Sequence, residues 1–288
     1  MQPELIADYA CVVGEGPLWH PDERRLYWTD IDTARLFRYD PASGVHEMVL
    51  EGVTVGGFTV QADGSLLLFG DRGAVTVRRP DGTLEPLIEE IPDERESRFN
   101  DVIADPAGRV FCGTMPDATG RPGRLYRLDA DGTLTVLLEG IGCSNGMGFT
   151  PDRRGMYYTD SARREIYRFR YDATTGALSN QRLFVRTPED EGVPDGLTVD
   201  ADGNVWSARW DGACLVCYAP DGVERRRIAF PVKKVSSVTF ADTNDRTDMY
   251  VTTAGGDQKE TDGAHAGALF RLNLDVRGGP EFVSRIGL

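Results

Sequence analysis

Short apolar runs broken by Gly, Pro and Asp recur along the whole chain and predict an all-β protein. Runs rich in Tyr, Trp and Val occur at 26–30, 110–114, 156–160 and 205–208, and a second apolar run follows each of them. Strand-length runs bounded by turn residues are typical of antiparallel sheets. No stretch has the 3.6-residue apolar period of an amphipathic helix.

Tight-turn signals recur at a regular interval and predict the number of sheets. The anchors are Asp22, Asp63, Ala107, Asp152, Asp202 and Asp245. Their spacing of roughly 41 to 50 residues is the interval of four-stranded propeller blades. The expected fold is a six-bladed β-propeller with four-stranded blades around a central metal-binding channel. With no linker-like stretch, we expect one domain over residues 1–288.

A propeller must also close its last blade so that no long sheet edge stays exposed. Residues 3–10 precede the first blade and could supply the outer strand of the last one. The run at 281–285 competes for that role. The sequence leaves both alternatives open.

Oxygen-bearing side chains recur at one register of the repeat, seven positions before a turn anchor. Four of the six equivalent positions carry a carboxylate or an amide: Glu15, Asn100, Asn145 and Asp195. The same offset in the other two repeats falls on Gly56 and Val238. Side chains at the start of innermost strands converge on the axis, so the pattern predicts a site for one divalent cation. Ca²⁺ fits this all-oxygen set best, and Zn²⁺, Mn²⁺, Mg²⁺ and Fe²⁺ also accept such ligands.

A less specific interpretation treats Asn145-Gly146 and Asp195-Gly196 as ordinary turn dipeptides. The shared register across four repeats favours the metal site.

Composition and net charge restrict the kinds of partner that this chain is expected to bind. The net charge is −14 and the pI is about 4.7, which disfavours nucleic acid and anionic membranes. No apolar run approaches the roughly 18 residues of a membrane span, and the first residues lack an export signal, so a cytoplasmic protein is expected.

Five cysteines, an odd number, indicate reduced thiols. The spacing of Cys214 and Cys217 resembles a redox motif, but a strand-like context favours packing. We expect a monomer or a small homo-oligomer.

The catalytic chemistry is narrowed by what is missing from the sequence. Only three histidines occur and no G-x-S-x-G motif is present, so serine-hydrolase chemistry is disfavoured. Metal-assisted hydrolysis remains, with Asp195 as general base for the attacking water. Arg98, two residues before Asn100, is expected in the same mouth as a hydrogen-bond donor to substrate. Asn100 is a candidate for both metal and substrate.

Five motifs resemble the senescence marker protein/gluconolactonase/luciferin-regenerating enzyme family, the regucalcin-like sugar lactonases. They are Gly14-Glu-Gly-Pro17, Arg98-Phe-Asn-Asp101, Gly113-Thr-Met115, Tyr158-Thr-Asp-Ser161 and Pro194-Asp-Gly196. The resemblance implies a propeller that binds one divalent cation and hydrolyses aldonolactones. It places the metal ligands on Glu15, Asn100, Asn145 and Asp195, the general base on Asp195 and the substrate-binding arginine on Arg98.

The chain departs from that family pattern at one position. Regucalcin-like members use a Glu shortly after Gly-Thr-Met to bind sugar hydroxyls, and Ala118 occupies the matching position here. The neighbouring Asp117 is the candidate substitute.

Three functions follow from these observations. The first is a cytoplasmic lactonase for a gluconolactone-, xylonolactone- or arabinonolactone-type substrate, a small-molecule sugar lactone. The second is a related metal-dependent hydrolase of other lactones or of phosphotriesters, because one scaffold hosts several reactions. The third is a non-enzymatic calcium-binding propeller.

Overall fold

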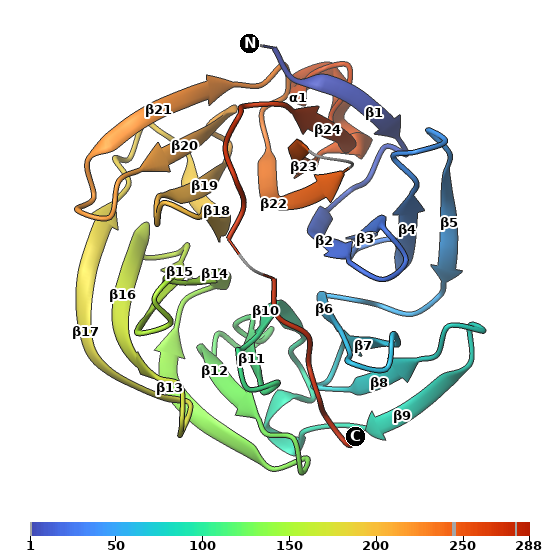
Figure 1. Ribbon diagram of the computed structural model, residues 1–288, viewed down its shortest axis with the longest axis vertical. Helices are drawn as coiled ribbons and strands as arrows, with labels where there is room; N and C mark the ends of the chain where they lie inside the picture. Colours follow the sequence, from blue (N-terminus) through green and yellow to red (C-terminus); the bar gives the residue numbers. More distant parts are fainter. Residues whose placement is uncertain (1, 244–245, 280) are drawn as a thin grey trace.

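The structure, a computed structural model, describes residues 2–243, 246–279 and 281–288. In this part of the chain 24 strands form six four-stranded antiparallel sheets arranged as blades around one axis (Figure 1). The predicted all-β, six-bladed propeller is confirmed. The predicted turn at Asp245 lies outside the described residues.

Each blade runs from an innermost strand at the axis to an outermost strand at the periphery. Blade 1 contains β2 (Gly14–His20), β3 (Arg25–Asp30), β4 (Arg35–Tyr39) and β5 (His46–Glu51). Blade 2 contains β6 (Gly57–Val60), β7 (Leu66–Phe69), β8 (Val75–Arg78) and β9 (Leu84–Ile88). Blade 3 contains β10 (Phe99–Ala104), β11 (Val110–Thr114), β12 (Gly123–Leu128) and β13 (Leu134–Ile141).

The second half of the ring repeats this order. Blade 4 contains β14 (Ser144–Phe149), β15 (Gly155–Asp160), β16 (Glu165–Asp172) and β17 (Ala177–Arg186). Blade 5 contains β18 (Val193–Val199), β19 (Val205–Trp210), β20 (Cys214–Tyr218) and β21 (Glu224–Ala229). Blade 6 contains β22 (Val235–Thr243), β23 (Arg246–Thr253), β24 (Ala268–Leu272) and, as its outermost strand, β1 (Glu4–Asp8).

The N-terminal strand closes the ring. β1 pairs antiparallel with β24, with Glu4 opposite Arg271 and Asp8 opposite Ala268. Of the two segments that could complete the last blade, the structure therefore selects the N-terminal one. The alternative at 281–285 takes another role, at the axis.

The last residues, 278–279 and 281–288, cross one end of the central channel and are called here the carboxyl-terminal strap (Figure 1). Main-chain bonds attach the strap to three blades: Gly279 N donates to Val199 O, Ser284 N to Val60 O, Arg285 N to Gly108 O and Gly287 N to Ala130 O. Glu281 extends from it to the channel wall and accepts a hydrogen bond of 3.2 Å from Thr239 Oγ1. The strap thus covers the end of the channel where the innermost strands finish.

The repeated turns explain why the spacing in the sequence was informative. In the β10–β11 turn, Asp105 Oδ1 accepts the backbone N–H groups of Ala107 and Arg109, and Gly108 adopts a φ of +87°. Asp200 does the same for Asp202 and Asn204 in the β18–β19 turn. A side-chain acceptor and a left-handed glycine together fix such a turn locally.

The hydrophobic core lies between neighbouring blades. Trp28 and Phe37 of blade 1, for example, pack against Tyr250 and Leu269 of blade 6. Cys214 and Cys217 are both buried in β20 but belong to the clusters on opposite faces of blade 5. Their predicted role in packing is confirmed, because neither thiol faces the other.

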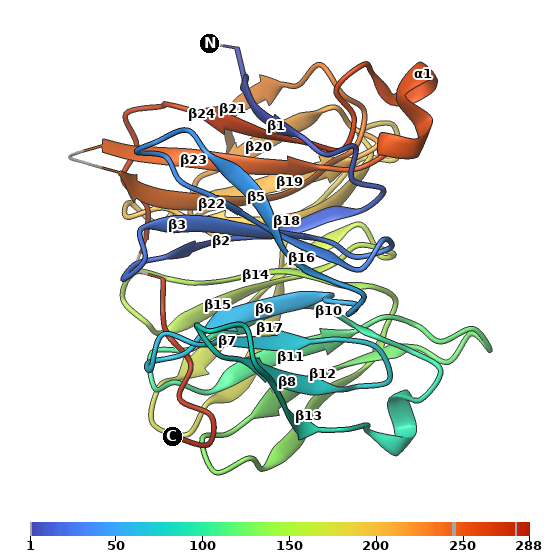
Figure 2. The same ribbon diagram turned by 90° about the vertical axis from the view of Figure 1, so that its right-hand side faces the viewer.

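Helical turns occur on the face opposite the strap. They are η1 (Pro92–Glu94), η2 (Gly256–Gln258) and α1 (Lys259–Asp262). Figure 2 shows α1 and the C-terminus on opposite sides of the disc. Among the described residues, no helix is long and apolar enough to cross a membrane.

The closure by β1 can be tested with one pair of substitutions. Ala7 is buried at the contact between blades 1 and 6, whereas Leu5 of the same strand is 41% exposed. Ala7→Asp buries a carboxylate and should cost about 2 kcal/mol, a fall in Tm of roughly 4–8 °C. Leu5→Asp is the matched control and should change Tm little. Thermal unfolding followed by circular dichroism measures both, and equal effects would contradict closure by β1.

Candidate metal centre and channel mouth

The four predicted donors all occur at the start of innermost strands. Glu15 lies in β2, Asn100 in β10, Asn145 in β14 and Asp195 in β18, and each is at most 6% exposed. These strands belong to blades 1, 3, 4 and 5 and surround the axis (Figure 1). The donors therefore occupy the end of the channel opposite the strap.

Two buried aspartates position the strands that carry Glu15 and Asn145. Asp30, at the end of β3, accepts the backbone N–H groups of Val12 and Val13 at 3.1 and 3.0 Å. Asp160, at the end of β15, accepts those of Gly142 and Cys143 at 3.1 and 3.2 Å. Each carboxylate thus fixes the backbone two or three residues before the donor. The Thr-Asp pairs of the sequence serve this purpose.

A chain of hydrogen bonds connects the donors across blades 3, 4 and 5. Arg98 Nη1 donates to Asn100 Oδ1 at 2.6 Å, and Asn100 Nδ2 donates to Asn145 Oδ1 at 2.9 Å. Asn145 Nδ2 donates to Ser161 Oγ at 2.8 Å. Ser161 Oγ in turn donates to the carbonyl of Pro194, the residue before Asp195, at 2.6 Å. The amide oxygens are thereby oriented before any ligand arrives.

The glycines that follow Asn145 and Asp195 lie in strands and not in turns. A Cβ at Gly146 would approach Leu197 N to 2.4 Å, and one at Gly196 would approach Ser237 Oγ to 2.1 Å. Both glycines therefore permit the close approach of neighbouring innermost strands at the axis. The interpretation of these dipeptides as turns is wrong.

The carboxyl groups of the site are buried close to one another, and this raises their pKa values. Burial raises the pKa of Glu15 well above its ordinary value, and the nearby Asp195 and Asp101 raise it further. Burial likewise raises the pKa of Asp195, and repulsion from Asp101 adds to this rise. Burial raises the pKa of Asp101 to about 7, against the opposing effect of Arg98. Three carboxyl groups thus share one poorly solvated space.

This donor set fits a hard divalent cation. Two carboxylates and two amide oxygens are the ligand types that Ca²⁺ and Mg²⁺ prefer, and a bound cation would offset the repulsion that raises the pKa values. Among the described residues, no group of three His, Cys, Asp or Glu side chains is gathered for a metal. The candidate site therefore depends on the amides of Asn100 and Asn145 as much as on the acids.

Counting seven positions back from the turn anchors places Gly56 and Val238 in the donor register of blades 2 and 6. Gly56 precedes β6, and a Cβ there would lie 2.0 Å from Phe99 O, so blade 2 contributes no side chain. In blade 6, Val238 pairs with Val251 beyond the bulge of β22, which falls between Val235 and Ser237. The assignment of Val238 to the donor register is wrong. The residue inside the bulge, Ser236, occupies that register and donates to Gly14 O.

Three site residues were not predicted from the sequence. Asp101 lines the channel because β10 has a bulge between Phe99 and Val102, so strict alternation fails there. Ser161 belongs to a quoted motif but had no assigned role. Arg209 is fully buried opposite Pro194 in the β18–β19 ladder, and its positive charge partly opposes the rise in the pKa of Asp195 that burial causes. The sequence alone does not identify this arginine as a site residue, because its position next to Asp195 follows from the pairing of β18 with β19.

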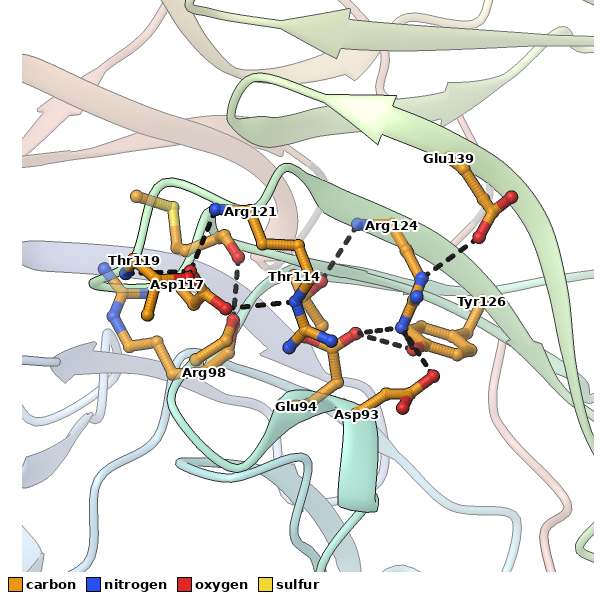
Figure 3. A network of polar contacts seen from close by, with 12 residues as sticks. Asp93, Glu94, Arg98, Thr114, Asp117, Thr119, Arg121, Arg124, Tyr126 and Glu139 are labelled. Carbon is orange, nitrogen blue, oxygen red and sulfur yellow. Dashed lines mark hydrogen bonds and ion pairs between the residues drawn. The ribbon is translucent and has the colours of Figure 1, made fainter.

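The mouth of the site is bordered by a rigid network around η1 (Figure 3). Tyr126 Oη donates to Glu94 Oε1 at 2.6 Å, and Arg124 Nη1 donates to the same oxygen at 3.2 Å. Arg124 also pairs with Asp93 at 3.0 Å. These bonds attach η1 to β12. Glu94, the last residue of η1, precedes Arg98 by four residues.

Asp117, the candidate substitute for the sugar-binding Glu, is engaged within its own loop (Figure 3). Its carboxylate accepts from Thr119 N and Oγ1 at 2.9 and 2.6 Å, and from Arg121 N and Nε at 2.9 and 3.0 Å. The bond from the Thr119 hydroxyl is the main reason that the pKa of Asp117 falls to about 2. A carboxylate has about four acceptor positions, so contact with a sugar would require this turn to open.

Below the donors the channel narrows to a small cavity of about 100 Å³. Its walls include Asp101, Thr59 and Ser237, and Glu281 of the strap lies at its far end. Burial raises the pKa of Glu281. Since the strap covers that end, a ligand reaches the donors from the mouth beside Arg98.

These features define a class of protein: a six-bladed propeller with one axial oxygen-donor site open on a single face. A family model described as "SMP-30/Gluconolactonase/LRE-like region" matches residues 13–255. The chain belongs to this family, and the predicted resemblance is confirmed.

Individual relatives agree with this assignment. Pentonolactonase XacC of Haloferax volcanii is 51% identical over 98% of both chains. L-arabinolactonase of Azospirillum brasilense is 35% identical over 93% of this chain and 91% of its own. A solved structure from Agrobacterium tumefaciens, described as the calcium-binding protein regucalcin, superposes with a TM-score of 0.90 at 26% identity, covering 99% of this chain and 97% of that one.

The buried acids predict an unusual dependence of metal-free stability on pH. The folded-state pKa values of Glu15, Asp195 and Asp101 lie above their unfolded values. Their protonation therefore stabilises the fold at low pH, and this stabilisation is lost as pH rises through the folded pKa values. In chelator, Tm should fall between pH 6 and pH 8, and Asp195→Asn should raise Tm at pH 8 by roughly 2–4 °C.

Differential scanning fluorimetry in chelator measures this effect. Asp190→Asn, in the exposed loop before β18, is the matched control and should leave Tm and its pH dependence unchanged. Added Ca²⁺ should stabilise the unsubstituted protein more than Asp195→Asn, because binding to the folded state raises stability by mass action. A Tm that falls in Asp195→Asn at pH 8 would contradict the repulsion.

Proposed function

We propose that this protein is a metal-dependent sugar lactonase that hydrolyses an aldonolactone to the aldonic acid. The observation that carries the proposal is the pair of buried, mutually repelling carboxylates, Glu15 and Asp195, beside the oriented amides at the mouth of a one-sided channel. The pentonolactonase and L-arabinolactonase relatives support a five-carbon lactone as the preferred substrate class.

The resident metal in this proposal is one divalent cation, with Ca²⁺ favoured. Glu15, Asn145 and Asp195 would hold it, and Asn100 would complete the set or support it through Asn145. When bound, the cation would polarise the lactone carbonyl and lower the cost of the negative charge that develops on its oxygen. The calcium-binding description of the Agrobacterium tumefaciens structure supports this choice of metal.

The protein side chains would supply positioning and proton transfer. Arg98 is half-buried at the mouth, with one nitrogen committed to Asn100 and Phe99 O, and its remaining N–H groups would donate to the lactone's hydroxyl or carbonyl oxygens. Asp195 would accept a proton from the attacking water as the water oxygen bonds to the carbonyl carbon. The ring C–O bond would then break, and the ring oxygen would take that proton from Asp195 to become a hydroxyl, which regenerates the carboxylate.

Asp195 is suited to this role by its surroundings. Its backbone is fixed by the Ser161 bond to Pro194 O, and burial, with repulsion from Asp101, raises its pKa well above the ordinary value of an aspartate, which makes it a stronger proton acceptor. We assign Asp117 an indirect role, since it shapes the loop after β11 that borders the mouth.

The proposal places the enzyme in the cytoplasm, as a monomer or a small homo-oligomer acting on a small molecule. All five cysteines are unpaired, which suits a reducing compartment. The calcium-binding description of the regucalcin structure also favours a second candidate, a propeller that binds calcium without turnover.

A lactone panel separates these candidates. Purified protein loaded with Ca²⁺, Zn²⁺ or Mn²⁺ should release acid from arabinono-, xylono- and gluconolactone above the spontaneous rate, measured by pH indicator, and chelator should abolish the release. Asp195→Asn should lower kcat by roughly 10²- to 10⁴-fold, and Arg98→Met should chiefly raise KM. Asp190→Asn is the control. Metal binding seen by calorimetry without any turnover would establish the calcium-binding candidate instead.

A further inference from the structure

A groove rich in arginine crosses the outer part of blade 4, away from the axis. Its volume is about 1020 Å³, and it is formed by the β14–β15 turn together with β16 and β17. Five arginines line it: Arg153, Arg154, Arg168, Arg170 and Arg182. Only two acids, Asp152 and Asp172, share the lining. In a chain with a net charge of −14, this is a local excess of three positive charges.

The two acids are occupied by their own turns. Asp152 accepts from Thr150 Oγ1 at 2.6 Å and from Arg154 N at 3.1 Å. Asp172 accepts the backbone N–H groups of Thr174 and Thr175. Each acid is thus held by its own turn. The hydrogen bonds from Thr150 and Arg154 N lower the pKa of Asp152, and Arg154 and Arg168 lie close enough for their positive charges to lower it further.

The arginines themselves lack ion pairs. None of the five has a carboxylate within salt-bridge distance among the described residues, whereas nearby Arg186 pairs with Glu165 and Arg127 with Asp129. Arg168 lies over the Tyr157 ring at 5.7 Å, Arg153 lies over the Phe282 ring at 5.4 Å, and Arg182 Nε donates to Asn180 Oδ1 at 3.3 Å.

Strand register places like charges face to face. Arg168 of β16 is directly opposite Arg182 of β17, and Arg170, two residues on, shares the face of Arg168. Like charges at directly opposite positions destabilise a sheet. The strands thus hold mutually repelling guanidinium groups around the groove.

We infer that this groove is a binding site for a small molecule that carries two or more phosphoryl groups. The planar guanidinium donates two parallel hydrogen bonds to a phosphate, and several arginines in one place match a multiply charged anion. A long nucleic acid is disfavoured, because the strongly acidic remainder of the surface would repel it. The site is distinct from the axial donors, and no step of the proposed hydrolysis uses it.

The test is calorimetric titration of metal-loaded protein with pyrophosphate, ADP and fructose 1,6-bisphosphate, in buffer with little salt. At least one of them should bind with a stoichiometry near one, and added KCl should weaken the binding by screening. The three ligands separate the sources of phosphate: an inorganic diphosphate, a nucleotide and a sugar bisphosphate.

Variants locate the binding. Arg168→Ser/Arg182→Ser should weaken it by about tenfold or more. Arg225→Ser/Arg226→Ser, a pair of exposed arginines on β21 with no ion pair among the described residues, is matched in charge and should leave it unchanged. Any heat from capture of the bound metal by pyrophosphate would persist in both variants, so only the difference between them reports the groove.

Two further measurements keep the inference open to refutation. The Arg168→Ser/Arg182→Ser variant should not melt below the unsubstituted protein, because it removes cross-strand repulsion; if it does, Arg168→Lys/Arg182→Lys keeps the charge and should weaken binding by less. Failure of all three ligands to bind, or equal loss in the β21 control, would overturn the proposal. Binding of poly-glutamate at the groove without phosphate binding would overturn it in favour of an acidic protein partner.

Discussion

The repulsion between Glu15 and Asp195 at the axis is the constraint on which the rest of the site depends. Two acids buried this deeply cost stability unless a cation or protons offset their charge. The surrounding structure holds them in place regardless: Gly16 N donates to Glu15 Oε2 at 2.9 Å, and the Ser161 bond fixes the backbone before Asp195. In the proposed metal site, rigidity of the strands would convert this electrostatic penalty into affinity for a divalent ion. The same rigidity is available because six blades close into a ring, which gives the innermost strands no freedom to separate.

Most of the fold could be predicted because the turns carry their own signals. In blades 2, 3 and 5 an aspartate acceptor followed by a glycine with positive φ specifies the inner turn without help from distant residues, whereas in blades 1 and 4 Arg24 and Arg153 adopt the positive φ. The number of blades follows from the regular spacing of these turns. The donor register was recoverable for the same reason in blades 1, 3, 4 and 5. It failed in blade 6, where β22 extends to Thr243 and the count from the turn lands beyond the bulge, on Val238 and not on Ser236. Counting is reliable only where hairpins have equal length.

The remaining site residues depend on the pairing of strands within a blade, which local patterns do not encode. Asp101 lines the channel only because a bulge in β10 breaks strand alternation, and Arg209 approaches Asp195 only through the pairing of β18 with β19. Asp117 illustrates the opposite case. Its position in the sequence suggested a sugar contact, but four local hydrogen bonds from Thr119 and Arg121 occupy its carboxylate. Whether an acid binds a ligand or its own loop is decided by which donors the fold places around it.

Closure of the channel by the strap has a consequence for specificity. Because the strap covers the far end, substrate and product pass the same mouth, and the groups that border it meet every ligand in transit. Arg98 and the network that attaches Glu94 and Asp93 to Arg124 form one side of that mouth. In the proposed mechanism the axial donors would act on the lactone carbonyl, which all aldonolactones share, so they would not distinguish one sugar from another. That mechanism would leave discrimination among sugars to the loops around η1 and after β11, where this chain has Ala118 in place of a glutamate.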